Sequence, residues 1–466
     1  MNVGYSSACP HEVLWNPAHI LCLRIRVNET SDPSLRAVDQ SLSTRPCRVA
    51  LFTETFLPKI DGVVTRLCQT VRHMQMFGHQ VLVVAPEGDI SEYEGARVHG
   101  VSGPPFPLYP DMKMAFPRPS IGKVVSEFRP DLIHAIQPML LGTAAFYYAS
   151  QLRVPLVVSY HAQVDRYLHY YGIGMLESLF WKAHKSAYNG ADLVLCTSRV
   201  MVDLLRSQGI HRVDLWQRGV DTELFRPELA SPEMRVRLSD GHPDAKLLVY
   251  IGRLSAEKGL EAAKPILQAI PGLRLALVGD GPHREKLQQH FAGTPTCFAG
   301  YMRGPELAAA YASADIFFMP SRTETLGLVV LEAMAAGTPV VAAAEGGILD
   351  IVRDGVTGHL YPYGNDTAAI SAVRKLLADT THHEEIRRAA RLDAEHWSWA
   401  AATRQLEGFY RQILARERDL PLLIAERSAS GVSPQETCES LQISKATLRR
   451  HQRLLEASRS YPNAAA

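Results

Sequence analysis

The fold is decided by residues 316–334, which read IFFMPSRTETLGLVVLEAM. The apolar run Ile316–Met319 predicts a strand that is buried on both faces, because it is short and every position is apolar. Polar residues follow it directly, and the apolar segment Thr325–Ala336 then predicts a helix. A strand, a polar loop and a helix in immediate succession indicate the unit from which parallel α/β sheets are built.

The same alternation extends along the chain in both directions. The other predicted strands are Arg48–Thr53, Gln80–Ala85, Leu132–Ala135, Pro155–Ser159, Leu193–Cys196, Leu247–Ile251, Arg274–Val278 and Pro339–Ala342. Predicted helices between them include Gly62–Phe77, Leu260–Ala269 and His283–Phe291. Alternation over about 350 residues predicts doubly wound α/β sheets.

Two sheets are favoured over one, because a single open sheet rarely exceeds about ten strands. The polar, proline-containing stretch Phe225–Pro243 marks the break between them. We therefore predict an α/β protein with two facing Rossmann-like domains, residues 47–225 and 226–399. The ligand is expected in the interdomain cleft, at the carboxyl ends of the parallel strands. A helix over 400–416 is expected to cross back to the first domain, and residues 417–466 to form a helical extension.

The composition limits the partners and compartments that the chain can have. The 466 residues carry 49 Lys+Arg against 48 Asp+Glu, which excludes bulk electrostatic attraction to nucleic acid but not a local basic patch. The 7 cysteines are scattered without CxxC spacing and predict neither a zinc site nor a disulfide framework. Residues 1–46 have no long apolar run and are expected to be a disordered leader, or the product of a start codon placed too early. These features favour a cytoplasmic protein.

The nearest approach to a membrane span is the uncharged stretch Ala135–Leu152, which contains Pro138 and Gly142. A span needs about 20 mostly apolar residues. A buried helix in a large core is therefore the favoured interpretation of this stretch.

The tail carries its own helix signals. Residues 433–436, Ser-Pro-Gln-Glu, form a capping box with proline at the first helical position. The predicted helices Pro434–Leu441 and Lys445–Ala457 flank a short turn and resemble a helix-turn-helix. Cations in the second helix are Lys445, Arg449, Arg450 and Arg453. DNA binding is one interpretation, and an appended hairpin with a solvated basic face is the favoured one.

The loop and helix after the strand Ile316–Met319 can bind an anion. Helix-start amides around Gly327–Val329 can hydrogen-bond a phosphate, assisted by the helix dipole. Glu324 precedes the helix, and Glu332 lies inside it among apolar residues, where an unpaired carboxylate would be costly. Glu332 therefore either accepts hydrogen bonds from two adjacent sugar hydroxyls or bonds a backbone amide of the core, and the spacing does not decide between them.

Two further strand ends of the second domain have polar or glycine-rich loops. Arg253 and Lys258 lie between two glycines directly after the strand Leu247–Ile251, and such a pair of cations suits a diphosphate. The spacing is not that of a P-loop, which argues against an ATPase. The turn Gly279-Asp280-Gly281 follows the next strand and suits a close backbone approach to a base or a ribose.

The first domain offers two candidates. Gly62 lies in the loop that joins the first strand to its helix, where backbone amides at the helix N-terminus are available to a ligand. His161 follows the strand Pro155–Ser159 at its carboxyl end. A hydrogen-bonded core histidine and a site residue are equally compatible with that position.

Together these motifs resemble those of the family-4 glycosyltransferases, which have the GT-B fold of two facing Rossmann-like domains. The resemblance covers the chain from Arg48 to about Ala415 and is strongest to the members that transfer sulfoquinovose from UDP-sulfoquinovose to diacylglycerol. The stretches that carry it are residues 50–58, 159–161, 215–221 and 321–328.

The resemblance implies roles for individual residues. Arg253, Lys258, His161 and Glu324 would act in catalysis, the first two by holding the diphosphate, and Glu332 would bind the uridine ribose. The implied donor-binding residues are Gly62, Arg253, Lys258, Gly279, Asp280, Glu324, Thr325, Leu326, Gly327, Leu328 and Glu332. The resemblance also implies retention of anomeric configuration and no requirement for a metal or other cofactor. No Asp-x-Asp or histidine cluster in the sequence contradicts this.

The implied partners are UDP-sulfoquinovose, diacylglycerol and the surface of a membrane, photosynthetic in the organisms of those relatives, whereas nucleic acid is not expected. Aromatic residues and cations within Tyr160–Lys185 suit an interfacial surface or packing inside the first domain. The sulfonate of such a donor would need cationic or amide partners, for which Lys59, Arg166 and Arg322 are candidates by position only. Three alternatives stay open: a mannosyl- or glucosyltransferase of the same fold, a nucleotide-sugar epimerase, and a sugar-sensing DNA-binding regulator.

Overall fold

The computed structural model describes residues 45–59, 61–106, 109–161, 175, 177–324 and 326–460. Internal contacts divide the chain into two units, Met1–Arg45 and Pro46–Ala466, and both large sheets belong to the second unit. The predicted disordered leader, residues 1–46, lies outside the described residues except for its last two positions.

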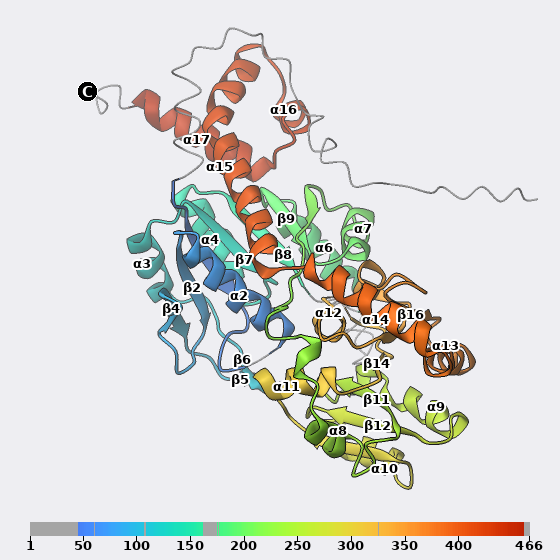
Figure 1. Ribbon diagram of the computed structural model, residues 1–466. Helices are drawn as coiled ribbons and strands as arrows, with labels where there is room; N and C mark the ends of the chain where they lie inside the picture. The colour runs from blue at the N-terminus through green and yellow to red at the C-terminus, as the bar shows by residue number, and fades with distance from the viewer. Residues whose placement is uncertain are drawn as a thin grey trace, which may run out of the picture. The chain divides into compact units, whose positions relative to one another are not determined.

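The first sheet, blue to green in Figure 1, has eight strands in the order β10-β9-β8-β7-β1-β2-β4-β3. Its strands are β1 (Arg48–Thr53), β2 (Gln80–Pro86), β3 (Glu92–Tyr93), β4 (Ala96–Val101), β7 (Leu132–Ile136), β8 (Leu156–Tyr160), β9 (Leu193–Cys196) and β10 (Val213–Leu215). All neighbours are parallel except the pair β3 and β4. A separate two-stranded ribbon is formed by β5 (Pro105–Phe106) and β6 (Tyr109–Lys113).

The second sheet has six strands, all parallel, in the order β13-β12-β11-β14-β15-β16. Its strands are β11 (Lys246–Ile251), β12 (Leu273–Val278), β13 (Thr296–Gly300), β14 (Ile316–Met319), β15 (Val340–Ala343) and β16 (Gly358–Tyr361). In both sheets the chain winds outward from a central strand and then reverses. The reversal lies between β1 and β7 in the first sheet and between β11 and β14 in the second, and ligands of open α/β sheets bind at such points. The predicted fold class, two Rossmann-like domains with parallel sheets, is confirmed.

Helices connect the strands of both sheets (Figure 1). In the first half they are α2 (Gly62–Met76), α3 (Pro119–Phe128), α4 (Thr143–Leu152), α6 (Glu177–Tyr188) and α7 (Arg199–Ser207). In the second half they are α8 (Pro232–Leu238), α9 (Ala263–Ala269), α10 (Arg284–His290), α11 (Gly304–Ala312), α12 (Leu328–Ala335), α13 (Asp366–Ala378) and α14 (Thr380–Glu395). Helix α2 covers its sheet because its apolar side chains, among them Val64, Leu67 and Val71, lie on one stripe.

The expectation of one buried helix over Ala135–Leu152 is wrong. Ala135 belongs to β7, and α4 begins only at Thr143. Pro138 and Gly142 separate the two elements, because proline lacks the N–H that a helix interior needs. Tyr147 of α4 is 60% exposed, so α4 lies at the surface. In the part of the chain that the structure describes, every helix is too short or too polar to span a bilayer.

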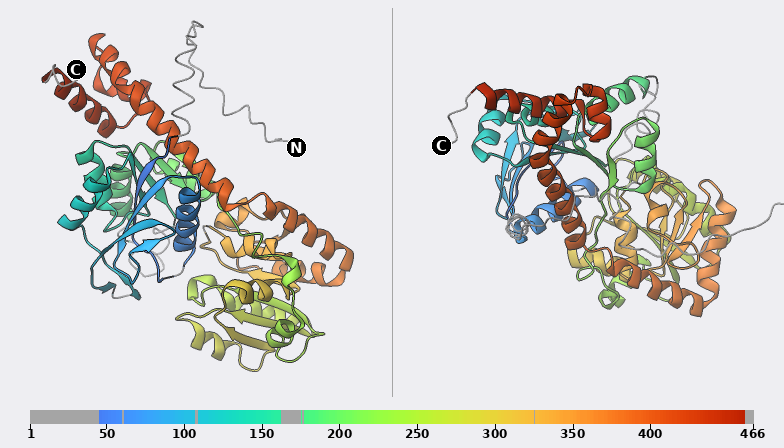
Figure 2. Two further views of the ribbon diagram at one scale, coloured as in Figure 1. Left: turned by 60° about the vertical axis from the view of Figure 1, so that its left-hand side comes forward. Right: turned by 90° about the horizontal axis from the view of Figure 1, so that it is seen from above.

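The predicted helix over 400–416 is the first part of a longer helix, α15 (Trp399–Ala429), which Figure 2 shows as one continuous rod. The division predicted at residue 417 therefore falls inside a helix. Leu406 and Tyr410 of α15 belong to the core of the first sheet, and the Tyr410 hydroxyl lies 2.6 Å from His134 Nδ1.

The tail after α15 has the arrangement of a helix-turn-helix. It consists of α16 (Pro434–Ser440), in which both halves of the predicted capping box are formed, and α17 (Lys445–Ser460). Gln442 in the turn has a φ of 50°, the left-handed conformation that a tight turn between two helices requires. Leu420, Ile424, Ile443 and Leu448 form a small core of their own.

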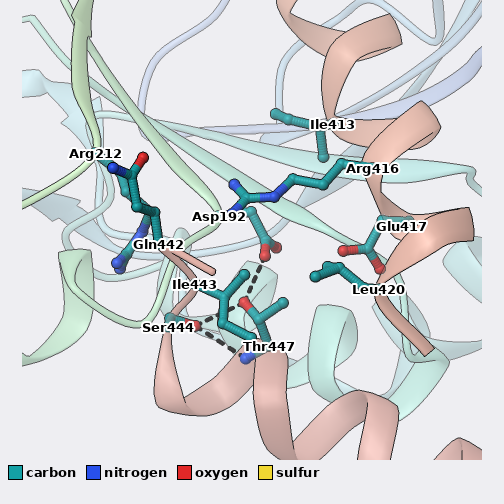
Figure 3. A pocket seen from close by; sticks show the side chains of 10 residues that line it. All are labelled: Asp192, Arg212, Ile413, Arg416, Glu417, Leu420, Gln442, Ile443, Ser444 and Thr447. Atoms are coloured by element: carbon teal, nitrogen blue, oxygen red, sulfur yellow. Dashed lines mark hydrogen bonds between the residues drawn. The ribbon is translucent and has the colours of Figure 1, made fainter. Parts of the chain in front are cut away.

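Helix α17 packs against the first half through polar contacts, one of which, from Thr447 to Asp192, is drawn in Figure 3. Ser444 Oγ donates to the carbonyl oxygen of Gly190 at 3.1 Å, and Thr447 Oγ1 donates to Asp192 at 2.6 Å. Arg450 donates to Asp192 at 3.1 and 3.2 Å and also to Glu417. A cavity lined by Asp192, Glu417 and Thr447, among others, has a volume of about 20 Å³, room for about one water molecule. Arg450 therefore faces the body of the protein. Of the four cations that a DNA-binding interpretation would use, Arg450 is not available to contact DNA.

Candidate active site

The two loops that carry the predicted diphosphate and sugar residues follow adjacent strands. β11 pairs with β14 in parallel, so the loop after β11 and the loop after β14 leave the sheet at the same edge. This is the reversal point of the second sheet, where the Rossmann fold binds its ligand.

Lys258 and Glu324 meet at this edge. Lys258 Nζ donates to Glu324 Oε2 at 2.7 Å, and the side chains are 19% and 14% exposed. The Glu324 Oε1 atom accepts the backbone N–H of Gly327 at 3.2 Å. Burial by itself would raise the pKa of Glu324, but the charge and hydrogen bond of Lys258, with smaller help from Gly327 and Arg218, hold that pKa below its usual value. Glu324 is thus an ionised carboxylate at neutral pH, fixed against a cation.

The N-terminus of α12 lies beside this pair. Gly327 is its N-cap and has a φ of 62°, a left-handed conformation in which glycine is preferred. The Gly327 amide already donates to Glu324, so it is not available to a phosphate. The backbone amides left for phosphate binding are those of Leu328 and Val329, because the first amides of a helix have no intrahelical partner. Thr325 lies outside the described residues. Leu326 is buried and forms a cluster with Leu328 and Trp399, so its side chain serves packing.

Glu332 projects from α12 towards α11. Its Oε2 atom accepts a hydrogen bond from the hydroxyl of Tyr311 at 2.9 Å. This partner is a side chain, whereas one of the two interpretations from the sequence expected a backbone amide. Burial raises the pKa of Glu332 to about 7, and the Tyr311 hydrogen bond opposes this only in part. The carboxyl group is therefore poised to change its charge near neutral pH.

Arg253 and the glycine turn at residues 279–281 follow β11 and β12, at the carboxyl ends of these two strands. Arg253 is exposed, and its carbonyl oxygen accepts the Tyr250 hydroxyl at 3.0 Å. Gly279 has a φ of 136°, and a Cβ there would lie 1.9 Å from the carbonyl oxygen of Gly252. The two loops can therefore touch only as long as this residue is glycine. Asp280 is exposed and pairs with Arg284 at 3.4 Å.

At Gly62 the first half comes close to the loop between β14 and α12, which carries several of the predicted donor-binding residues. Asp61 caps α2 by accepting the amides of Val63 and Val64. A Cβ on Gly62 would lie 3.4 Å from Leu326 Cδ1 and 3.8 Å from Leu328 Cδ1. The predicted donor-binding residues of the two halves are thus neighbours.

His161 is a buried residue of the first half. It is 2% exposed, its Nε2 lies 2.7 Å from Ser159 Oγ, and its amide donates to Gln137 Oε1. Its ring meets Trp216 edge to face. Burial, then the charge of Arg66, lowers the pKa of His161 well below its ordinary value. The ring is therefore neutral, and its position at the carboxyl end of β8 is as predicted.

Sequence reasoning missed Tyr311 and Arg218, which both act on the predicted glutamates. Tyr311 bonds Glu332, and the charge of Arg218 helps to lower the pKa of Glu324. Arg218 lies within the stretch 215–221, which carries part of the family resemblance, and that position is a signal that could have drawn attention to it. Within the described ranges, no group of three or more histidine, cysteine or acidic residues is placed to hold a metal ion.

Comparison with protein families gives two matches that together cover most of this chain. Residues 60–224 match the model of Glycosyltransferase Family 4, and residues 238–393 match that of Glycosyl transferases group 1. The boundary between the matches lies within the predicted break at Phe225–Pro243.

Among known proteins, the chain is 38% identical over 392 residues to sulfoquinovosyl transferase SQD2 of Arabidopsis thaliana, covering 82% of this chain and 77% of that protein. It is 33% identical over 390 residues to a GDP-mannose-dependent alpha-mannosyltransferase of Corynebacterium glutamicum, covering 83% of this chain and 94% of that protein. The crystal structure of Anabaena HepE in complex with UDP is similar in fold, with a TM-score of 0.62 and 20% identity over 78% of this chain and 99% of that one. These findings favour a transferase over a nucleotide-sugar epimerase. The chain belongs to the family-4 glycosyltransferases of the GT-B fold.

Proposed function

We propose that this glycosyltransferase moves sulfoquinovose from UDP-sulfoquinovose to diacylglycerol, with retention of anomeric configuration and without a metal. The observation that carries the choice of sugar and acceptor is the 38% identity to the Arabidopsis sulfoquinovosyl transferase over 392 residues. The geometry at the reversal point of the second sheet supports the chemistry, since cations and helix amides gather there.

Arg253 and Lys258 are proposed to replace the metal of other transferases. As the sugar leaves, negative charge grows on the β-phosphate, and fixed positive groups beside it lower the barrier. Lys258 is already held in place by Glu324 at 2.7 Å, so little reorganisation is needed when the donor binds. The amides of Leu328 and Val329 add the positive end of the α12 dipole.

The transfer itself is proposed to occur by front-face attack. The acceptor hydroxyl oxygen bonds to the anomeric carbon while the bond from that carbon to the β-phosphate oxygen breaks. The hydroxyl proton passes to the departing phosphate oxygen, so UDP leaves and no protein base is required. Glu324 faces the sugar, neutral His161 lines the centre from the acceptor side, and Gly62 lets its loop approach the phosphate.

The sulfonate of the donor needs cationic partners. Lys59 pairs with Asp61 at 3.4 Å beside the N-terminus of α2. Arg322 is exposed next to the Glu324 loop, with its guanidinium 5.4 Å from the centre of the Tyr363 ring. Arg166 lies outside the described residues, as does most of the Tyr160–Lys185 segment proposed to touch the membrane surface.

One assay separates the candidate donors. Purified protein is incubated with diacylglycerol vesicles and UDP-sulfoquinovose, UDP-glucose or GDP-mannose, with and without EDTA, and the lipid products are analysed by mass spectrometry. We expect sulfoquinovosyl diacylglycerol in both conditions, with kcat/KM at least about 10²-fold above that for UDP-glucose, because cationic groups built for a sulfonate are left unpaired by a hydroxyl. Equal transfer from UDP-glucose would refute the donor assignment. Mannolipid from GDP-mannose alone would favour the mannosyltransferase alternative, which the Corynebacterium relative supports.

Glu332 predicts a pH dependence of donor binding. With its pKa near 7, the carboxylate is mostly protonated at pH 6 and mostly ionised at pH 8, and only the ionised form accepts two ribose hydroxyls. The Kd for UDP-sulfoquinovose, measured by calorimetry, is therefore expected to fall by about tenfold over this range, in step with the competent fraction. Because the folded pKa lies above the unfolded one, the same group contributes stability at low pH that is lost as pH rises towards 7.

The matched variant for this prediction is Glu332→Gln, which cannot ionise. It is expected to bind UDP-sulfoquinovose more weakly than the wild type at pH 8 and with no pH dependence between 6 and 8. A wild-type Kd that stays constant over this range would contradict the role of Glu332 at the ribose.

A further inference from the structure

The segment that leads from the first half to the second is held by a buried arginine of the first half. Arg66 of α2 is 1% exposed. Its Nη2 atom donates to the carbonyl oxygens of Trp216 at 2.9 Å and Gln217 at 2.6 Å, and its guanidinium lies 3.7 Å from the centre of the Trp216 ring. The backbone just before Arg218 is therefore fixed to α2.

Arg218 itself reaches both halves of the protein. It is 2% exposed. Its Nη2 atom donates to the carbonyl oxygen of Thr197 in the first half, and its Nη1 atom donates to that of Gly347 in the second half at 2.8 Å. Asp350 accepts from Arg218 at 3.3 Å and from the backbone amide of Arg199, the first residue of α7, at 2.8 Å.

Gly347 connects this arrangement to Glu324. The Gly347 amide donates to the carbonyl oxygen of Glu324 at 2.8 Å. Gly346, with a φ of 59°, packs so closely that a Cβ on it would lie 2.4 Å from the same carbonyl oxygen. A single residue, Gly347, therefore joins the Arg218 guanidinium to the backbone of Glu324, and the planar fork of arginine is suited to bind several oxygens at once.

We propose that Arg218 is a positioning residue for Glu324: through Gly347 it fixes the Glu324 backbone, and through Thr197 and Asp350 it makes that position depend on contact between the two halves. The proposal goes beyond the proposed function, because it applies whichever sugar is transferred. Arg218 does not need to touch the substrate. Burying a guanidinium costs free energy, because the charge leaves water. The positioning of Glu324 gives a reason for a buried arginine at the junction of the two halves.

The second half offers a matched control. Arg235 of α8 also binds carbonyl oxygens, those of Pro243, Ser313 and Ala245, together with one carboxylate, Asp315, at 2.6 Å. These partners flank the amino ends of strands, whereas the active site lies at the carboxyl ends. Arg218→Lys and Arg235→Lys therefore remove similar sets of hydrogen bonds, and only the first is expected to affect Glu324.

The test is a double-mutant cycle, with each variant measured for kcat, donor KM and thermal stability. The proteins are wild type, Arg218→Lys, Glu324→Gln and the double variant, with Arg235→Lys in both backgrounds as the control. The donor is whichever of UDP-sulfoquinovose, UDP-glucose or GDP-mannose the wild type turns over, so failure of the proposed sugar leaves this test intact. Asp350→Asn is the second variant if Arg218→Lys does not fold.

The expected result is a kcat about 10²-fold lower for Arg218→Lys, the size of effect that a small displacement at a reacting centre produces, with donor KM changed by less than about threefold. In the Glu324→Gln background the same change should lower kcat by less than about threefold, because residues that act as a unit are not additive. Asp350→Asn should show the same dependence on Glu324 with a smaller loss. Equal losses of kcat in both backgrounds, or equal losses for Arg218→Lys and Arg235→Lys, would overturn the proposal.

Discussion

Replacing Lys258 with alanine is expected to lower kcat/KM by about 10²–10³-fold, the usual effect of removing one preorganised group that stabilises developing charge. Lys258 lies at the reversal point of the second sheet and is only 19% exposed, so water replaces its charge poorly. The same loss is expected for Arg253→Ala, because both cations are proposed to bind the departing diphosphate. Steady-state kinetics with the preferred donor and diacylglycerol measure both effects.

The control for Lys258 is Lys246, a residue of the same strand-and-loop unit at the opposite end of β11. Lys246 is 52% exposed and lies 3.9 Å from Asp315, and exposed pairs of this kind contribute little. Lys246→Ala should keep kcat/KM within about threefold of the wild type. A loss of less than about tenfold for Lys258→Ala and Arg253→Ala would show that neither cation has the electrophilic role proposed for it.

Replacing Arg450 with methionine is expected to lower the free energy of unfolding by about 3–5 kcal/mol, since removing one member of a buried ion pair leaves its charged partners without their cation. Arg450 is 9% exposed and is shared by Asp192 and Glu417. The charges of these two carboxylates raise the pKa of Arg450 although burial opposes this, so the guanidinium is charged throughout the accessible pH range. Urea unfolding at pH 7 measures the change.

The neighbouring Arg449 gives the matched variant, because it lies in the same helix and is exposed. Arg449→Met should change stability by no more than about 0.5 kcal/mol. Equal destabilisation by the two variants would mean that the contacts of α17 with Asp192 contribute nothing specific. Catalysis by the folded Arg450→Met protein is expected to be unchanged. Asp192 lies at the amino ends of the parallel strands of the first sheet, whereas His161 lies at their carboxyl ends.

The central strands could be predicted from sequence, and several edge strands could not. β1, β9 and β14 have the predicted bounds, because strands buried on both faces form nearly continuous apolar runs. β13 and β16 pair with a single neighbour each and contain Thr296, Gly300 and Gly358. Edge strands have less apolar area to bury, so the pattern that reveals a central strand is absent from them.

The candidate site was predictable where its residues follow strands in a short motif. Lys258 and Glu324 each follow a buried strand, and the pairing of β11 with β14 brings them together. The role of Arg218 was not predictable, because two of its partners are backbone carbonyl oxygens 21 and 129 residues away in the sequence. A carbonyl oxygen is present at every position, so no sequence pattern marks it as a partner. The role of Tyr311 was hidden for a related reason, since its ring also fills the core beside Phe317.

The packing of α15 has a consequence for the order in which the protein can fold during synthesis. Leu406 and Tyr410 complete the same core as Val49 and Leu51 of β1, although more than 300 residues separate them along the chain. Domains usually fold in turn as they leave the ribosome, but here the first sheet lacks part of its cover until the residues of α15, Trp399–Ala429, have emerged. A fragment that ends at residue 225 would therefore keep an apolar face open to water, and expression of the first half in soluble form would require α15 to be supplied with it.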